Sequence, residues 1–108
     1  MIGKENVNMN KNYIKVSIIE TGKPKGSKES YQNWGVQRFT FKSAIEAVDF
    51  ISDRYGKCKK VPMFVDDKQG KAIKIGKIYC YSIKLEGKVF VAQDWVEIKK
   101  VSEMALAI

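Results

Sequence analysis

Hydrophobic and polar residues alternate along two stretches near the start of the chain. Residues 13–20 place isoleucine or valine at every second position, and residues 34–42 place Phe39 and Phe41 on one face with polar residues on the other. An alternation with a period of two predicts strands that bury one face. Residues 21–30 between them contain glycine, proline, serine and lysine but no hydrophobic residue, which predicts a surface loop.

The pattern becomes helical immediately after the second stretch. Ser43 and Glu46 stand at the spacing of a capping box, and Gly56 is expected to end the helix in a left-handed conformation. Between them, hydrophobic residues recur at the spacing of one helix face, which predicts that this face packs on the core. These residues are Ala44, Ile45, Ala47, Val48, Phe50, Ile51 and Tyr55.

The second half of the chain consists of β-rich runs separated by turn residues. Pro62 cannot donate a hydrogen bond to a sheet, so its run is expected at a sheet edge. Gly76 lies where the alternation of the longest run breaks, which predicts a bulge or a bend. Glu86 and Gly87 predict a hairpin turn. The expected strands are residues 61–65, 72–85, 88–92 and 95–101, with a turn at 66–70 and a kink at 93–94.

These elements predict an α+β fold in which a single helix packs on a mostly antiparallel sheet. The expected order is β-β-α-β-β-β, with one more strand if the kink divides the last run. The pattern leaves open whether the C-terminal meander stays open or curls into a small barrel. The 108 residues suffice for one core, so we expect one domain over residues 13–108 after a lead-in at residues 1–12.

The composition removes most catalytic chemistry. The chain contains no histidine, which excludes nucleophiles activated by histidine and metals held by histidine. Asp66, Asp67, Asp94 and Glu97 would hold a cation only if the strands brought them together, so we expect solvated surface carboxylates. We therefore predict a protein that is not an enzyme and that uses no metal and no cofactor.

Cysteine usage and hydropathy bear on the compartment. Cys58 and Cys80 are too far apart in sequence for a zinc-binding pair, and we expect both to be buried thiols. No hydrophobic run approaches the roughly 18 residues that a membrane span requires. Residues 1–11 lack the apolar core of a secretory signal. We expect a protein of the cytoplasm, bacterial or host, that does not contact a membrane.

The net charge of +8 is unevenly distributed. Residues 1–42 carry eight basic and three acidic side chains, and residues 57–77 carry seven and two. Residues 43–56, which include the expected helix, carry one basic and three acidic side chains, and residues 78–108 are balanced. Two basic zones thus flank an acidic helix, and a basic zone attracts polyanions.

Each basic zone contains candidate binding residues. In the first, mobile lysines run into aromatic rings that could stack on unpaired bases, although packing over a sheet edge is the alternative role of Tyr31 and Trp34. In the second, lysines follow the helix and continue onto the next hairpin. The candidate nucleic-acid-binding residues are Lys23, Lys25, Lys28, Tyr31, Trp34, Lys57, Lys59, Lys60, Lys71, Lys74 and Lys77.

Two short stretches resemble known families. Trp34-Gly35-Val36, followed by Phe39 and Phe41, resembles the opening of a WGR domain, a nucleic-acid-linked module, although Val36 stands where that family has arginine. Residues 67–79 are similar to a stretch of small phage-encoded proteins of the YopX-like kind, which implies a curled β meander. No function is carried over from either resemblance.

These observations lead to two main hypotheses about function. The first is a small basic module that binds nucleic acid with low sequence specificity, preferably single strands or RNA, because 18 of the 20 basic residues are lysine rather than arginine. The second is a phage or mobile-element protein that docks on a host protein and inhibits or redirects it. An enzyme that uses carboxylates and a lysine is the weakest alternative. The oligomeric state is not indicated by the sequence.

Overall fold

The computed structural model describes residues 12–102, and most of the expected lead-in lies outside them. One helix and five strands follow in the order β-β-α-β-β-β, which confirms the predicted α+β fold. The elements are β1 (Asn12–Pro24), β2 (Gln32–Phe41), α2 (Ala44–Tyr55), β3 (Lys59–Asp66), β4 (Ala72–Leu85) and β5 (Lys88–Ser102).

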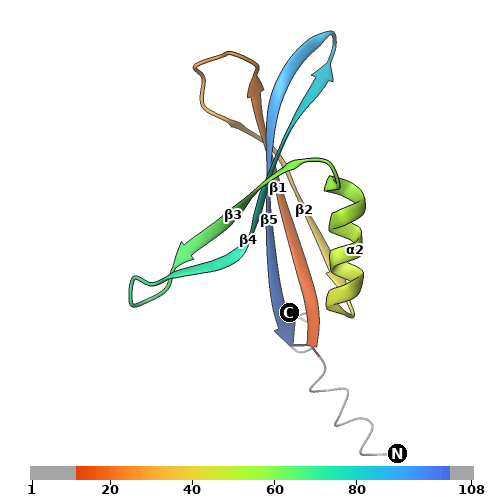
Figure 1. The fold of residues 1–108 in the computed structure, drawn as a ribbon, viewed down its shortest axis with the longest axis vertical. Coiled ribbons are helices and arrows are strands. Elements are labelled where there is room, and N and C mark those ends of the chain that lie inside the picture. Colours follow the sequence, from red (N-terminus) through yellow and green to blue (C-terminus); the bar gives the residue numbers. More distant parts are fainter. Residues whose placement is uncertain (1–11, 103–108) are drawn as a thin grey trace, which may run out of the picture.

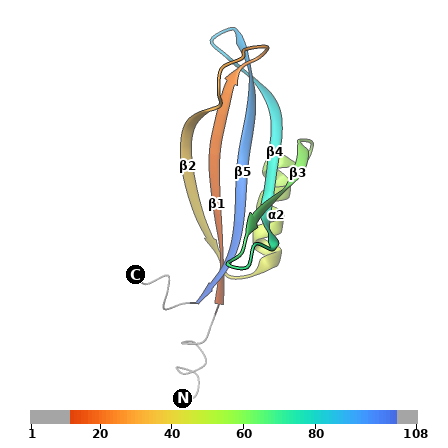
Figure 2. The same cartoon turned by 90° about the vertical axis from the view of Figure 1, so that its left-hand side faces the viewer.

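The five strands form one antiparallel sheet in the order β2-β1-β5-β4-β3. The strands lie side by side in Figure 2, with α2 behind them. β2 and β3 are the two edges of the sheet and do not pair with each other, so the sheet is open and the alternative of a small barrel is wrong. β3 contains Pro62 and lies at an edge, as predicted.

Of two expected interruptions of the strands, one is absent and the other is shorter than predicted. The predicted kink at residues 93–94 is wrong because Gln93 and Asp94 pair with both β1 and β4, so that β5 runs without a break. The predicted loop at residues 21–30 is shorter than expected, since β1 continues to Pro24 in register with β5. In both places, hydrogen bonding within the centre of the sheet overrides the local preference of these polar residues for turns and loops.

The helix begins as predicted and ends differently. The Ser43 hydroxyl accepts a hydrogen bond from the Glu46 backbone N–H at 3.3 Å, while the Glu46 carboxylate accepts from the backbone N–H of Lys42 at 3.2 Å. Gly56 adopts a right-handed conformation, with φ of −49°, so the predicted left-handed stop is wrong. The Tyr55 carbonyl instead accepts a hydrogen bond from the Cys58 backbone N–H, which closes the turn after α2.

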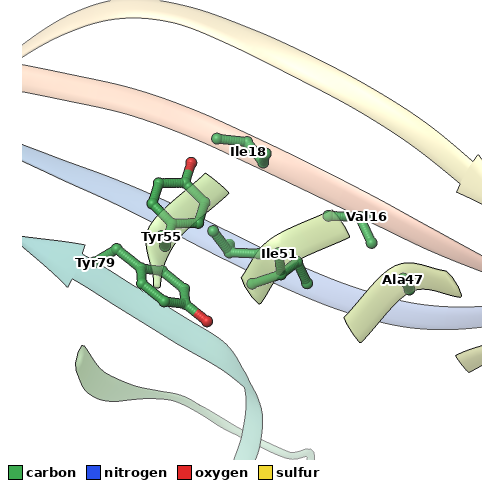
Figure 3. Packing of buried hydrophobic residues seen from close by; sticks show 7 residues of the cluster. Val16, Ile18, Ala47, Ile51, Tyr55 and Tyr79 are labelled. Carbon is green, nitrogen blue, oxygen red and sulfur yellow. The ribbon is translucent and has the colours of Figure 1, made fainter. Parts of the chain in front are cut away.

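The core lies between α2 and one face of the sheet. Figure 3 shows α2 facing Val16 and Ile18 of β1, with the Tyr55 ring beside the ring of Tyr79. These two rings stack at 4.3 Å between their centroids. In the middle of the helix, Phe50 packs against the aromatic side chains of β2. The core residues are Val16, Ile18, Ala47, Ile51, Tyr55, Tyr79 and Val96, with Phe39, Phe41 and Phe50 half-buried around them.

The hydrophobic stripe of α2 is only partly buried. Ile45 is 72% exposed and Val48 is 55% exposed, so their predicted place in the core is wrong. Val48 faces the side on which β4 leaves β5 at Gly76, so the sheet does not extend beneath it. Ile45 lies about 120° around the helix from Ile51 and points away from the sheet. The helix therefore buries the narrower stripe of Ala47, Ile51 and Tyr55.

Gly76 is the position at which β4 bends. A Cβ atom at this residue would overlap the carbonyl oxygen of Val96 on β5, so only glycine allows the two backbones to approach this closely. The pairing of β4 with β3 shifts by one residue beside it, between Met63 and Phe64, which confirms the predicted bulge or bend. Figure 1 shows the hairpin of β3 and β4 swinging away from the sheet on the side opposite to α2.

Among residues 12–102, no helix is long and apolar enough to cross a membrane. Cys58 and Cys80 are both free thiols and both half-buried.

The two isoleucines of α2 allow a matched test of this packing. Ile51→Ala removes a buried side chain and is expected to lower the free energy of unfolding by about 2–4 kcal/mol. Ile45→Ala removes an exposed side chain and is expected to change it by about 0.5 kcal/mol or less. Urea denaturation followed by circular dichroism measures both, and equal losses would contradict the orientation of α2.

Candidate nucleic-acid interface

One face of the sheet carries α2, and within the described residues no helix covers the other face, from which the β3–β4 hairpin projects near Glu97 and Lys99 (Figures 1 and 2). Side chains of a strand point alternately to the two faces. In β5, Ala92, Asp94 and Val96 are buried on the helix side, so Trp95 between them lies on the uncovered face. We call this surface the open face.

A row of hydrophobic side chains crosses the open face, with one residue from each strand. Each residue in the row is the register partner of the next. Trp95 occupies the centre and is 37% exposed, although a ring of this size is usually more deeply buried in a monomer. In the order of the strands, the row is Val36, Ile19, Trp95, Ile78 and Val61.

Basic side chains lie on the open face on both sides of this row. Lys15 and Lys99 are direct register partners on β1 and β5, and two like charges placed opposite each other repel. Lys23 lies towards the other end of β1. Arg38 of β2 pairs with Ser17 and is two residues from Val36, the member of the row on β2. Glu97 lies on the same face, opposite Ser17, and leaves the surface with a clear excess of positive charge. A bound anion would relieve the repulsion between the two paired lysines.

The first basic zone lies beside one end of the open face. The Lys23 ammonium group lies 5.0 Å from the centre of the Tyr31 ring, while Lys25 and Lys28 are exposed in the loop between β1 and β2. In Figure 1, this loop lies at the top of the molecule, beside the hairpin of β4 and β5. The structure thus keeps Lys23 and Tyr31 together, as the sequence pattern suggested.

Trp34, by contrast, packs on the helix side of the sheet. Its ring lies where a Cβ atom of Gly22 would stand, and it meets the Phe90 ring edge-on at 5.9 Å. Trp34 and Trp95 are almost equally exposed, at 38% and 37%, but only Trp95 lies in the hydrophobic row of the open face. Trp34 therefore packs near a sheet edge, which was the alternative role considered for it.

The second basic zone is divided between surfaces. Lys59 pairs with Cys80 and belongs to the open face, whereas Lys60 lies over the Tyr79 ring on the helix side, 5.9 Å from its centre. Lys77 pairs with Val96 and also points to the helix side. The remaining candidates are exposed in the turn after α2 and along the hairpin of β3 and β4, and they are Lys57, Lys71 and Lys74.

The two zones lie far apart along the molecule. Figure 1 shows the β1–β2 loop at the top and the tip of the β3–β4 hairpin at the lower left. The zones therefore do not form one continuous patch. The sequence analysis did not identify Trp95, Lys15 or Lys99 as candidate binding residues. The alternation of side chains between the two faces around residue 95 was the signal that could have identified them.

The strands do not bring the four carboxylates considered in the sequence analysis together. Asp94 is 1% exposed, so its predicted place on the surface is wrong, and it lies on the helix side while Glu97 lies on the open face. Asp67 instead accepts hydrogen bonds from the backbone N–H groups of Gln69 and Lys71 in the β3–β4 turn. Within the described part of the chain, no group of three candidate ligands is placed to hold a metal ion.

Asp94 is the centre of a buried hydrogen-bond network. Its carboxylate accepts a bond of 2.6 Å from the Tyr55 hydroxyl of α2 and one of 3.1 Å from the Tyr81 hydroxyl of β4. The Arg54 guanidinium donates to the Tyr55 hydroxyl at 3.1 Å and approaches Glu20 at 3.9 Å. These bonds join α2 to β4, β5 and β1.

The network also shifts the acidity of its tyrosines. Burial, followed by the hydrogen bond to Asp94, raises the pKa of Tyr55 far above its ordinary value. Burial, followed by the charge of Asp94, raises the pKa of Tyr81 to about 12. Both effects favour the neutral hydroxyl, which is the form that donates to the carboxylate. A cavity of about 220 Å³ adjoins the network and is lined by Arg54, Tyr55, Cys58, Tyr81 and Asp94.

Comparison of the chain with models of known families, with curated proteins and with solved structures finds no match.

The raised tyrosine pKa values predict a loss of stability at high pH. A tyrosine ionises near pH 10 in the unfolded chain, whereas Tyr81 does so at about 12 in the fold. Its contribution is therefore complete below pH 10 and is lost as the pH rises from 10 to about 12. Urea midpoints measured across this range should fall more steeply for the wild type than for Tyr81→Phe. Parallel curves for the two proteins would contradict the prediction.

The bond between Tyr55 and Asp94 predicts energetic coupling. Tyr55→Phe removes the donor, and Asp94→Asn removes the charge, so each is expected to cost about 1–3 kcal/mol of unfolding free energy. Because both substitutions act on the same charge-assisted bond, the double variant should lose less than the two single losses together. Denaturation of the four proteins in urea measures this cycle. Additive losses would show that the two side chains act independently.

Proposed function

We propose that the protein binds single-stranded nucleic acid on the open face, with low sequence specificity. Trp95 stacks on a base, and Lys15, Lys23, Lys99 and Arg38 contact the phosphates on either side of it. The observation that carries this proposal is the position of Trp95, which is exposed at the centre of the uncovered face, between basic side chains along β1 and β5.

The spacing of these groups suits a flexible strand. Strand residues rise by about 3.3 Å each, so Trp95 and Lys99 are roughly 13 Å apart along β5. A single strand laid along β1 and β5 would pass Lys23, then Trp95, then the pair of Lys15 and Lys99. Each stacked base would contribute about 1–3 kcal/mol of binding free energy, whatever its identity.

Several features favour a single strand over a duplex. The bases of a duplex already stack on one another and leave no free face for Trp95. Sequence reading in a duplex depends mainly on arginine, asparagine and glutamine in the grooves, whereas the phosphate-contacting groups proposed here are mostly lysines. A single strand or RNA loop is therefore the expected ligand, as the composition suggested.

Docking of a host protein on the open face is the second candidate. The hydrophobic row favours it, since exposed hydrophobic patches mark many protein interfaces. Along β1 and β5, however, the row is only one residue wide. Thr21 and Gln93 border it on one side, and Ser17 and Glu97 border it on the other. A single polar-bordered row that contains a stacking ring suits a nucleic acid strand better than a broad protein surface.

The two tryptophans provide a direct test of stacking. In Trp34→Phe, Trp95 is the remaining indole, and its fluorescence should be strongly quenched when oligothymidine binds. In Trp95→Ala, Trp34 is the remaining indole, so binding should be weaker by about 1–3 kcal/mol and the quenching should largely disappear. Fluorescence titration at low salt measures both. Equal affinity of Trp95→Ala and the wild type would contradict the proposal.

Neighbouring lysines of β5 test the phosphate contacts. Lys99 lies on the open face, while Lys100 pairs with Ile14 on the helix side. Lys99→Gln should lower the slope of log affinity against log salt by about 0.7, and Lys100→Gln should leave it unchanged. Affinities for oligothymidine from roughly 50 to 200 mM salt give these slopes. Equal effects of the two substitutions would exclude the open face as the phosphate-binding surface.

A further inference from the structure

The bend of β4 leaves part of β5 with one neighbouring strand. Pairing between β4 and β5 ends at Gly76 and Glu97, whereas β5 continues in register with β1. Residues 98–101 of β5 therefore have a register partner on β1 but none on β4. In Figure 1, β3 and the adjoining part of β4 diverge to the left of β5, and the gap between the hairpin and the lower part of β5 holds hollows that reach Ile98.

Hydrophobic side chains line this gap, which we call the notch. Three hollows, of about 120, 270 and 320 Å³, meet at Ile98 of β5. Ile75 and Val65 form the wall on the hairpin, and Val48 forms the wall on α2. Ile98 is 42% exposed. The notch thus has an aliphatic floor and walls and contains the unpaired side of a strand.

The charge around the notch is strongly positive. Lys60, Lys74, Lys77 and Lys99 line the three hollows, against the single carboxylate of Glu97. A second copy of this chain would bring the same lysines and would be repelled. Nucleic acid would meet mainly aliphatic walls, since the aromatic residue in their lining, Tyr79, is buried and already stacked on Tyr55. Charge and shape together favour a peptide with both acidic and aliphatic side chains.

We propose that the notch binds an extended acidic segment of a partner protein, which adds as a strand beside residues 98–101 of β5. Its backbone completes the hydrogen bonding of the sheet edge, as in known cases of strand addition. Because side chains of a strand alternate between two faces, one face of the segment places aliphatic groups on Ile98, Ile75 and Val65. The carboxylates of the segment lie near the surrounding lysines.

A synthetic peptide of alternating valine and glutamate tests this proposal with the full chain. We expect it to bind, and we expect a peptide of alternating valine and lysine to bind at least about tenfold more weakly. Ile98→Glu places a negative charge in the notch, which would repel the glutamates of the acidic peptide and should weaken its binding by about tenfold or more. Fluorescence anisotropy of the labelled peptides gives the affinities.

Ile45→Glu is the matched control, since Ile45 is an exposed isoleucine of α2 that lines none of the three hollows. This variant should bind the acidic peptide within about twofold of the wild type. Circular dichroism and urea denaturation establish that both variants fold. Trp95→Ala, which removes the stacking ring of the nucleic acid proposal, should also leave peptide binding unchanged, so failure here is distinct from failure of that proposal.

Several results would overturn the proposal. One is equal binding of the acidic and basic peptides, and another is unchanged binding by a folded Ile98→Glu variant. Self-association that Ile98→Glu abolishes would assign the notch to a second copy of the chain. A chain that ends at Ser102 and binds the peptide at least about tenfold more tightly than the full chain would assign the notch to residues 103–108.

Discussion

The burial of Asp94 constrains the whole molecule. A carboxylate at 1% exposure is costly unless hydrogen bonds replace the water it has lost. Tyr55 and Tyr81 supply those bonds from α2 and β4. Because Tyr55 is the last residue of the helix, its bond to β5 fixes where α2 ends on the sheet. The aliphatic core between Val16 and Ile51 then determines how the helix lies along β1.

The position of Asp94 also determines which side chains face away from the helix. Trp95 follows Asp94 directly in an unbroken strand, so burial of one residue turns the other to the open face. Lys99 shares the parity of Trp95, and Lys15 and Ile19 of β1 meet this set through their register with β5. The surface proposed to bind nucleic acid is thus a geometric consequence of the buried network on the opposite face.

The sequence predicted the elements better than their faces. Local signals located the helix, whose cap at Ser43 has a distinct pattern, and the edge strand, which contains Pro62. They did not predict that Asp94 is buried, because a lone acidic residue in a strand usually lies on the surface, and its partner Tyr55 is 39 positions away. Val48 was expected in the core because periodicity cannot show that the sheet bends away at Gly76.

The candidate site was predictable only in its chemistry. Lysines and exposed aromatic rings were the expected groups, yet Trp34 packs on the helix side and the two basic zones lie apart. The choice between Trp34 and Trp95 depends on which side of the sheet α2 covers. The lysines behind the net charge of +8 surround two different surfaces. One is the open face, with an exposed tryptophan ring, and the other is the notch, with aliphatic walls.

Side-chain NMR during titration with oligothymidine shows which face of the sheet binds nucleic acid. The Trp95 indole N–H and the methyl groups of Ile19 and Ile78 on the open face should shift. The Trp34 indole and the methyl groups of Ile18 and Ile51 on the helix side should change little. Shifts concentrated on Trp34, Ile18 and Ile51, or none at low salt, would contradict binding on the open face.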